Sequence, residues 1–382
     1  MSRPLLLAYR PLGLGDLLTG VPALRALRHA FSRHRLVLAA PAVLAPLAEL
    51  SGAVDELVDT APLAVPAVAG ADIAVNLHGR GPQSHRAILA AHPRRLIAFA
   101  APDVPWRGPE WRAGEHEVHR WCRLLTQSAV PADPTRLDLA APDDPGRSGG
   151  LAVRGATVVH PGAASAARRW PSERWAAVAR AERGAGRRVL VTGSAAERGL
   201  AEAVAQAAGL GAGDVLAGRT DLRGLAAVVA HAGRVLCGDT GVAHLATAFA
   251  TPSVLLFGPT PPQEWGPPPE RARHVVLHRG GRGDPHADAP DPGLLAITVA
   301  DVLAVTSRRF PACRAGNAGD MGLTDKISGR IKKAAGDLAD DPSMRREGHL
   351  EERKGEAKDD RARAEEHADA KADEVDDLER RT

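Results

Sequence analysis

Aromatic residues are scarce in this sequence and make up 3% of its 382 residues. Because 44% of the residues are hydrophobic, the cores must be built from alanine, valine and leucine. The three cysteines, Cys122, Cys237 and Cys313, are scattered and show neither metal-site spacing nor the density of a disulfide framework. This scarcity excludes a disulfide-stabilised secreted domain and favours a reducing compartment.

A long apolar run is also missing from the N-terminus, which reads "MSRPLLLAYRPLGLGD". Three leucines followed by Ala8, Tyr9 and Arg10 are too few for a signal peptide or a membrane span. We therefore expect a cytoplasmic protein that can lie peripherally at the inner face of the membrane. No cluster of His, Asp and Cys has metal-ligand spacing, so we expect neither a metal site nor a cofactor.

Lysine is absent from the first 325 residues, and all six lysines lie in the C-terminal segment. Residues 320–382 carry a net charge of −5 and the remainder +8. Arginine-only usage is typical of a biased coding sequence, so we expect no nucleic-acid partner. The change in composition marks a boundary at Met321.

The segment 320–382 has no aromatic residue and few apolar positions, so it cannot bury enough surface to form a stable globule. We expect a charged helical or disordered tail. Its stretches "GRIKKAAG" and "RKGEAK" resemble the CsbD-like stress-response proteins. The alternative is a solvated charged tail without that relationship.

The rest of the sequence alternates between apolar strands and amphipathic helices. Strands are predicted over 5–9, 35–40, 71–79 and 95–100 and a helix over 16–31, and a similar series begins after residue 150. The stretch 131–150 is rich in Pro, Asp and Gly and is typical of a linker. This order predicts an α/β protein with two doubly wound domains, 1–140 and 151–309, that face a cleft.

Glycine-rich turns follow several of these strands, at the edge where such domains bind ligands. The first turn is "GLGD", in which Asp16 follows Gly15 at the start of a helix. Asp16 is either a helix N-cap or a general base that faces an acceptor hydroxyl.

Two further stretches belong to the second domain. "HPGAASAARRWPSERW" contains Arg168, whose guanidinium suits a diphosphate, although it could equally be a solvated arginine. "VTGSAAERG" contains Glu197, which could accept from ribose hydroxyls or satisfy the N-terminus of a helix.

The stretch "GDTGVAHLATAFATPSVLLFG" reads as a strand end, a tight turn, a helix and another strand. Asp239, Thr240 and Gly241 open that helix and His244 lies one turn in, so backbone N–H groups and the helix dipole create an anion site. His244 could reach the same pocket or pack against the neighbouring strand.

These motifs, in this order, resemble glycosyltransferase family 9, which includes the ADP-heptose:lipopolysaccharide heptosyltransferases. The strongest stretches are "LGLGDLLTGVPALRALR", "RRWPSERW" and "GDTGVAHLATAFATPSVLLFGPT". The resemblance covers residues 3 to 309 and implies a GT-B architecture of two Rossmann-like domains. It implies that Asp16 is the catalytic base, and that the donor is bound by Gly15, Arg168, Glu197, Asp239, Thr240, Gly241 and His244. Arg168 stands where the family usually has lysine.

The resemblance further implies inverting, metal-independent transfer of heptose from ADP-heptose to a cell-envelope glycan or glycolipid. The alternative is a catalytically silent nucleotide-sugar-binding protein that acts in stress response through its CsbD-like tail. Such a protein has no need of a base at Asp16. A dinucleotide-dependent oxidoreductase is disfavoured, because no full G-x-G-x-x-G opens the first helix.

Overall fold

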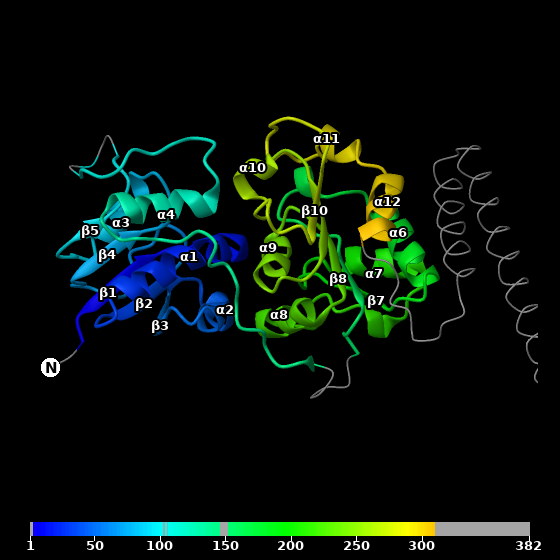
Figure 1. Ribbon diagram of the computed structural model, residues 1–382, viewed down its shortest axis with the longest axis horizontal. Coiled ribbons are helices and arrows are strands. Elements are labelled where there is room, and N and C mark those ends of the chain that lie inside the picture. The colour runs from blue at the N-terminus through cyan, green and yellow to red at the C-terminus, as the bar shows by residue number, and fades with distance from the viewer. Residues whose placement is uncertain (1–2, 102–103, 105, 146–151, 310–382) are drawn as a thin grey trace, which may run out of the picture.

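The computed structural model describes residues 3–101, 104, 106–145 and 152–309. The CsbD-like tail predicted over 320–382 lies outside these residues. In Figure 1 the described chain forms two α/β halves side by side, with the N-terminal half in blue and cyan and the other in green to orange.

Each half contains one five-stranded parallel sheet. The first has the order β3-β2-β1-β4-β5 and consists of β1 (Leu5–Tyr9), β2 (Arg35–Ala40), β3 (Glu56–Asp59), β4 (Ile73–Asn76) and β5 (Leu96–Ile97). The second has the order β10-β9-β8-β6-β7 and consists of β6 (Thr157–His160), β7 (Val189–Val191), β8 (Arg234–Gly238), β9 (Ser253–Phe257) and β10 (His274–His278). Every pairing among these strands is parallel, as the continuous apolar runs predict.

Helices connect the strands and cover the sheets. Those of the first half are α1 (Leu14–Ala30), α2 (Ala45–Leu50), α3 (Gln83–Leu89) and α4 (Glu117–Gln127). Those of the second are α6 (Ser172–Gly184), α7 (Arg198–Ala208), α8 (Leu222–His231), α9 (Gly241–Ala248), α10 (Pro262–Trp265), α11 (Pro292–Leu295) and α12 (Val299–Arg309). None of the helices among the described residues is long and apolar enough to cross a membrane.

Several predicted bounds were wrong. The helix predicted over 16–31 begins two residues earlier, at Leu14, with Gly13 as its N-cap. The strand predicted over 71–79 is reduced to β4, and the one over 95–100 to β5. A strand needs a hydrogen-bonded neighbour as well as apolar residues, and β5 pairs with β4 at only two positions.

The connection from β3 to β4 contains no helix. A parallel crossover usually carries one, but residues 60–71 cross the sheet as an irregular segment. Its Val68 packs on a buried cluster that includes Leu7 and Tyr9 of β1. This segment therefore performs the covering role that a helix performs elsewhere in the fold.

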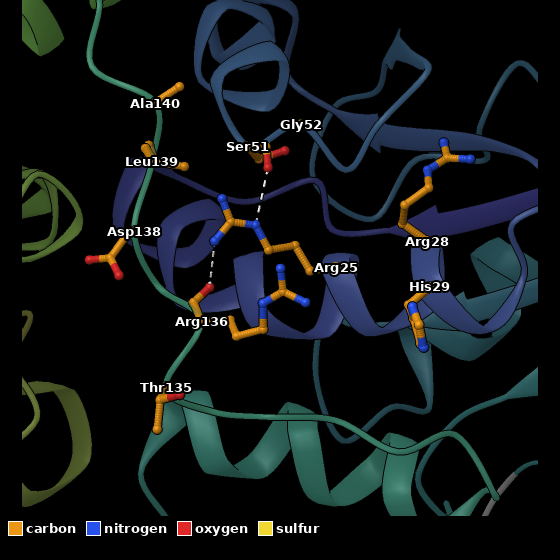
Figure 2. A pocket seen from close by; sticks show the side chains of 10 residues that line it. All are labelled: Arg25, Arg28, His29, Ser51, Gly52, Thr135, Arg136, Asp138, Leu139 and Ala140. Atoms are coloured by element: carbon orange, nitrogen blue, oxygen red, sulfur yellow. Dashed lines mark hydrogen bonds between the residues drawn. The ribbon is translucent and has the colours of Figure 1, made fainter.

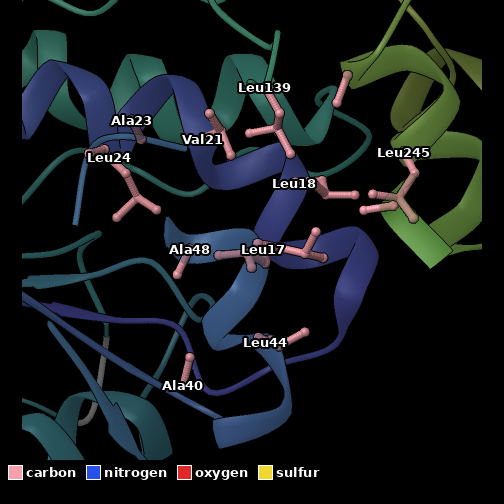
Figure 3. Close-up of a cluster of buried hydrophobic side chains, with 14 of the residues drawn as sticks. Leu17, Leu18, Val21, Ala23, Leu24, Ala40, Leu44, Ala48, Leu139 and Leu245 are labelled. Atoms are coloured by element: carbon pink, nitrogen blue, oxygen red, sulfur yellow. The ribbon is translucent and has the colours of Figure 1, made fainter. Parts of the chain in front are cut away.

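The two halves meet through α1 and α9. Leu17, Leu18 and Leu24 of α1 belong to one buried cluster with Val242 and Leu245 of α9. Figure 3 shows Leu18 and Leu245 pointing toward each other across this contact. The linker also contacts the second half, because the Leu139 N–H donates to the Ala248 carbonyl at 3.0 Å.

Removal of the residues from Met321 onward should leave the described body folded, since the segment 320–382 has few apolar positions and the buried clusters among the described residues already extend from Leu6 to Leu303. We expect the melting temperature to change by less than about 2 °C, because 1 kcal/mol shifts a domain of this size by roughly 2–4 °C. Calorimetry on full-length and shortened chains measures this. A much larger fall would mean that the tail contributes to the core.

Candidate active site between the two halves

The carboxyl ends of the strands carry the residues that the sequence singled out. Asp16 follows β1, Arg168 follows β6, Glu197 follows β7, and Asp239 follows β8. β6 pairs with both β7 and β8, so the last three come together at one edge of the second sheet. Asp16 lies in the other half, in the first turn of α1.

The N-termini of α1 and α9 touch. A Cβ placed on Gly15 would lie 3.0 Å from Cδ2 of His244 and 3.8 Å from Cα of Gly241. A Cβ on Gly241 would lie 2.6 Å from Cγ and Cδ2 of Leu14. A side chain on Gly241 would require Leu14 to shift, and one on Gly15 would require the His244 ring to give by a few tenths of an ångström, so both positions are constrained by the contact between the halves.

Asp16 is the third residue of α1 and not its N-cap, so the predicted N-cap position was wrong, and its role as a general base stays a prediction. Its Oδ2 accepts a hydrogen bond from the Gly13 N–H at 3.2 Å, and its Oδ1 lies 3.8 Å from Nη2 of Arg10. Burial raises the pKa of Asp16, and the Arg10 charge opposes this effect while Glu117 adds to it. A more basic carboxylate is a better proton acceptor near neutral pH.

Arg10 and Glu117 are site residues that the sequence reasoning missed. The side chain of Arg10 is fully buried and donates to the carbonyls of Asp16 and Leu77, to Oγ1 of Thr19 at 3.1 Å, and to Oε1 of Glu117 at 3.3 Å. Its signal in the sequence was an arginine placed directly after the buried run "LLLAY".

Glu117, the first residue of α4, is tied into the same network. Its Oε1 accepts from Nε1 of Trp121 at 2.7 Å and its Oε2 accepts from Arg120. The Arg10 guanidinium lies 4.9 Å from the centre of the Trp121 ring, within the range of a cation–π contact. The carboxylate of Glu117 therefore links Arg10, after β1, to Arg120 and Trp121 of α4.

The predicted anion site has the expected helix start. Thr240 is the N-cap of α9, and its hydroxyl accepts from the Val242 N–H at 3.3 Å. The buried Asp239 carboxylate lies 3.8 Å from Nη1 of Arg168. Burial raises the pKa of Asp239, while Arg168 and a hydrogen bond from Thr260 lower it.

Glu197 lies at the neighbouring strand end. Its Oε2 accepts from the N–H and the hydroxyl of Ser194, both at 2.8 Å. A Cβ placed on Gly162 would lie only 2.0 Å from Oε1 of Glu197, so this carboxylate covers the turn after β6. One oxygen orders the loop and the other lies over the edge where a ribose is expected.

His244 packs between the halves, where its contacts are with Gly15 of α1 and Trp265 of α10 and not with the neighbouring strand that one of its two predicted roles named. Its ring stacks edge-on against Trp265 with 5.9 Å between ring centres. Burial lowers the pKa of His244 to about 4, and the neighbouring His116 acts in the same direction. The small cavity beside it holds about 10 Å³ and is lined by residues of both halves.

A hollow of about 750 Å³ lies elsewhere, around the C-terminal end of α1 (Figure 2). Arg25 is nine residues after Asp16, or about 14 Å along a helix axis, so this hollow is not beside the predicted base. Arg25 donates to the carbonyl oxygens of Ser51 at 3.1 Å and Arg136 at 2.8 Å. We interpret Arg25 as the residue of this hollow that fastens the linker to α1.

Among the described residues, no group of three or more His, Cys, Asp or Glu side chains is arranged to hold a metal ion.

Comparison with solved structures defines the fold class. The architecture matches solved GT-B structures, including a family 9 glycosyltransferase from Veillonella parvula, with a TM-score of 0.65, 20% identity and coverage of 80% of this chain and 97% of that one. The E. coli ADP-heptose lipopolysaccharide heptosyltransferase II gives a TM-score of 0.61, 19% identity and coverage of 78% and 96%. The predicted α/β fold of two facing Rossmann-like units is thereby confirmed.

The sequence comparisons find similarity to one family over part of the chain. Residues 104–289 match the model of glycosyltransferase family 9 (heptosyltransferase). Lipopolysaccharide heptosyltransferase 1 of Pseudomonas aeruginosa is 36% identical over 158 residues, which is 39% of this chain and 41% of that protein. The aligned region spans about two fifths of the length of this curated relative. In sequence, the chain is thus similar to glycosyltransferase family 9 over residues 104–289.

The His244 pKa predicts an acid-sensitive contact between the halves. The folded protein disfavours the protonated ring, so its stabilising effect is present above pH 6.5 and is lost as the pH falls toward 4. We expect His244→Gln to remove up to about 3 kcal/mol of the stability change across this range. Denaturant unfolding at a series of pH values measures it.

The matched control is His29→Gln, at an exposed position of α1. It should leave the pH dependence as in the parent. An unchanged slope in His244→Gln would contradict the burial of a neutral imidazole at this contact.

Proposed function

We propose that the chain transfers a sugar from a nucleotide-diphosphate donor to a glycan or glycolipid of the cell envelope, with inversion at the anomeric carbon. The observation that carries this proposal is the meeting of α1 and α9, which brings the carboxylate-bearing turn of one half against the anion-binding helix start of the other. The names of the similar proteins favour ADP-heptose as the donor and lipopolysaccharide as the acceptor.

Asp16 acts as the general base in this proposal. Its carboxylate takes the proton of the acceptor hydroxyl while that oxygen forms a bond to the anomeric carbon. The bond from that carbon to the diphosphate breaks, and the electron pair leaves with the phosphate oxygen. Attack opposite to the leaving group inverts the anomeric configuration. The raised pKa of Asp16 favours this transfer.

The second half stabilises the leaving diphosphate. Negative charge grows on it as the bond breaks, so N–H groups at Thr240 and Gly241 and the guanidinium of Arg168 bind it more strongly in the transition state. Gly15 allows the close approach of the two halves, and Glu197 meets the ribose hydroxyls. Asp239 holds Arg168 in place from behind, since a carboxylate repels the diphosphate. His244 closes the donor side of the cleft.

Asp16→Asn should lower turnover by about 10²- to 10⁴-fold, the usual contribution of a general base. ADP affinity should stay close to that of the parent, because the base belongs to the acceptor side. Steady-state turnover and calorimetric titration with ADP measure the two effects. Asparagine keeps an oxygen that can accept from the Gly13 N–H, so helix capping is retained.

Asp214→Asn is a matched control, since Asp214 also accepts from the backbone N–H of a helical N-cap, that of Gly211 at 3.1 Å. Its turnover should be unaffected. Normal turnover in Asp16→Asn would remove Asp16 as the base from this proposal, whereas a parent protein that binds ADP without turnover would favour a binding protein without catalysis.

Arg168→Ala should weaken ADP binding by about 1.5–3 kcal/mol, the range for a hydrogen bond to a charged group. Partial exposure of this side chain places the expected value toward the lower end. The neighbouring Arg169 donates to the Ala163 carbonyl at 2.9 Å, so Arg169→Ala is the control and should bind ADP as the parent does. Equal losses in both variants would mean that the effect is general rather than a contact with the diphosphate.

A further inference from the structure

The crossover segment, residues 60–71, is an exposed stretch without charge. A quarter of the residues of the chain are charged, yet none of the twelve in "TAPLAVPAVAGA" is. Leu63 and Val65 are 46% and 55% exposed. A single exposed aliphatic side chain is ordinary, whereas several that lie together on an uncharged surface are the feature by which interaction sites are recognised.

Hydrogen bonds to Tyr9 and Ala91 hold the backbone of the segment, and this fixes the position of its exposed side chains. The Tyr9 hydroxyl donates to the Ala64 carbonyl at 2.8 Å, and the Gly70 N–H donates to the Ala91 carbonyl at 2.9 Å. Pro66 is buried, and Leu63 has a φ of +60°, in the left-handed region. The backbone therefore turns Leu63 outward without relying on a flexible loop.

A second aliphatic tip lies on the neighbouring connection. Val43 is 65% exposed and follows β2, the strand next to β3. The Ala42 N–H beside it donates to Oδ1 of Asp59, the last residue of β3, at 2.8 Å. The connections after β2 and β3 are thus fastened together, and both leave aliphatic side chains in solvent.

Two exposed arginines lie on the connection after β4 and on α3. The Tyr9 ring contacts that of His78 with 5.9 Å between ring centres, and Arg80 follows two residues later. Arg80 and Arg86 are exposed, and neither guanidinium has a hydrogen-bond or ion-pair partner within the described part of the chain. Outside the tail the chain carries a net charge of +8.

This surface borders the predicted base. β1 lies between β2 and β4 in the sheet, so the turn that carries Asp16 has Val43 on one side and Arg80 on the other. Arg10, which contacts Asp16, is also close enough to His78 to lower its pKa, after the larger effect of burial.

We propose that the crossover segment, together with Val43, Arg80 and Arg86, is a docking surface for a bilayer that contains anionic lipid. Leu63, Val65 and Val43 enter the interface, and the two arginines pair with anionic headgroups. The inference rests on the proposed function only for its purpose, which is to hold a membrane-bound acceptor beside Asp16. Binding itself does not require turnover.

Vesicle flotation with the full chain tests the surface. Phosphatidylcholine vesicles with and without about a third phosphatidylglycerol serve as probes. The parent should float with the anionic vesicles. The double variant Leu63→Asp with Val65→Asp should lose more than about tenfold in partitioning, since it removes aliphatic contacts and adds charges that the headgroups repel. Aspartate tolerates the left-handed backbone at position 63, so the fold is preserved.

This variant and a second one, in which the two arginines are changed, each have a matched control. Leu295→Asp changes an exposed leucine of the second half, 37% exposed, and should partition as the parent does. Arg80→Ser with Arg86→Ser should lose about fivefold per arginine on anionic vesicles. Arg94→Ser, whose exposed guanidinium lies at the opposite edge of the sheet beside Asp72, should show no loss of this size.

The same samples are titrated with ADP and examined by sedimentation velocity. Parent protein that ignores anionic vesicles, or equal losses in the variants and their controls, would overturn the proposal. A change from dimer to monomer in Leu63→Asp with Val65→Asp would instead identify the surface as an interface between copies and also overturn it. Vesicle binding without ADP binding would contradict the proposed function and leave the docking surface standing.

Discussion

The guanidinium of Arg10 is a full positive charge buried at the carboxyl end of the central strand β1, and the N-terminal half is arranged to satisfy it. An unpaired buried charge costs several kcal/mol. Its partners come from three elements: the first turns of α1, the start of α4 through Glu117, and the end of β4 through the Leu77 carbonyl. The position of Asp16 relative to the sheet therefore follows from how this one charge is buried.

The contact between α1 and α9 adds a second constraint. Both N-termini carry partial positive charge, and they lie against each other where Gly15 faces His244 and Gly241 faces Leu14. Each helix brings one carboxylate close to this junction, Asp16 on α1 and Asp239 just before α9. His244 is kept neutral there by burial, so the contact gains no further positive charge. The anion site that we propose at this junction would draw on the partial positive charge of the helix start at α9.

The sequence was a good guide to the fold because apolar runs and glycine turns are local features. The strands 5–9 and 35–40 and the helix start at Gly241 were predicted at their positions. Partners distant in the sequence were not predictable in the same way. Glu117 meets Arg10 across 107 positions, and no local pattern around "EHEVHRW" indicates that pairing.

The same reasoning explains the partial success with Asp16. Its motif indicated either a helix N-cap or a base, and in the structure one oxygen accepts from the N–H of the actual N-cap, Gly13, while the other lies beside Arg10. The roles of Glu197 and Arg168 toward a donor stay predictions, because a nearby loop contact accounts for part of each side chain. The crossover segment was not anticipated, since periodicity describes helices and strands but not an irregular cover for a sheet.

The linker is fastened on both sides, which gives the joint between the halves a particular character. Arg25 of α1 donates to the Arg136 carbonyl, while Arg271 of the second half donates to Oδ1 of Asp138 at 2.7 Å and to the Thr247 carbonyl at 2.9 Å. These hydrogen bonds and the ion pair restrain the linker against both halves. Because Asp138 is well exposed, dissolved salt screens its attraction to Arg271. Higher ionic strength therefore weakens this one contact of the linker, whereas the buried contact between α1 and α9 does not depend on it.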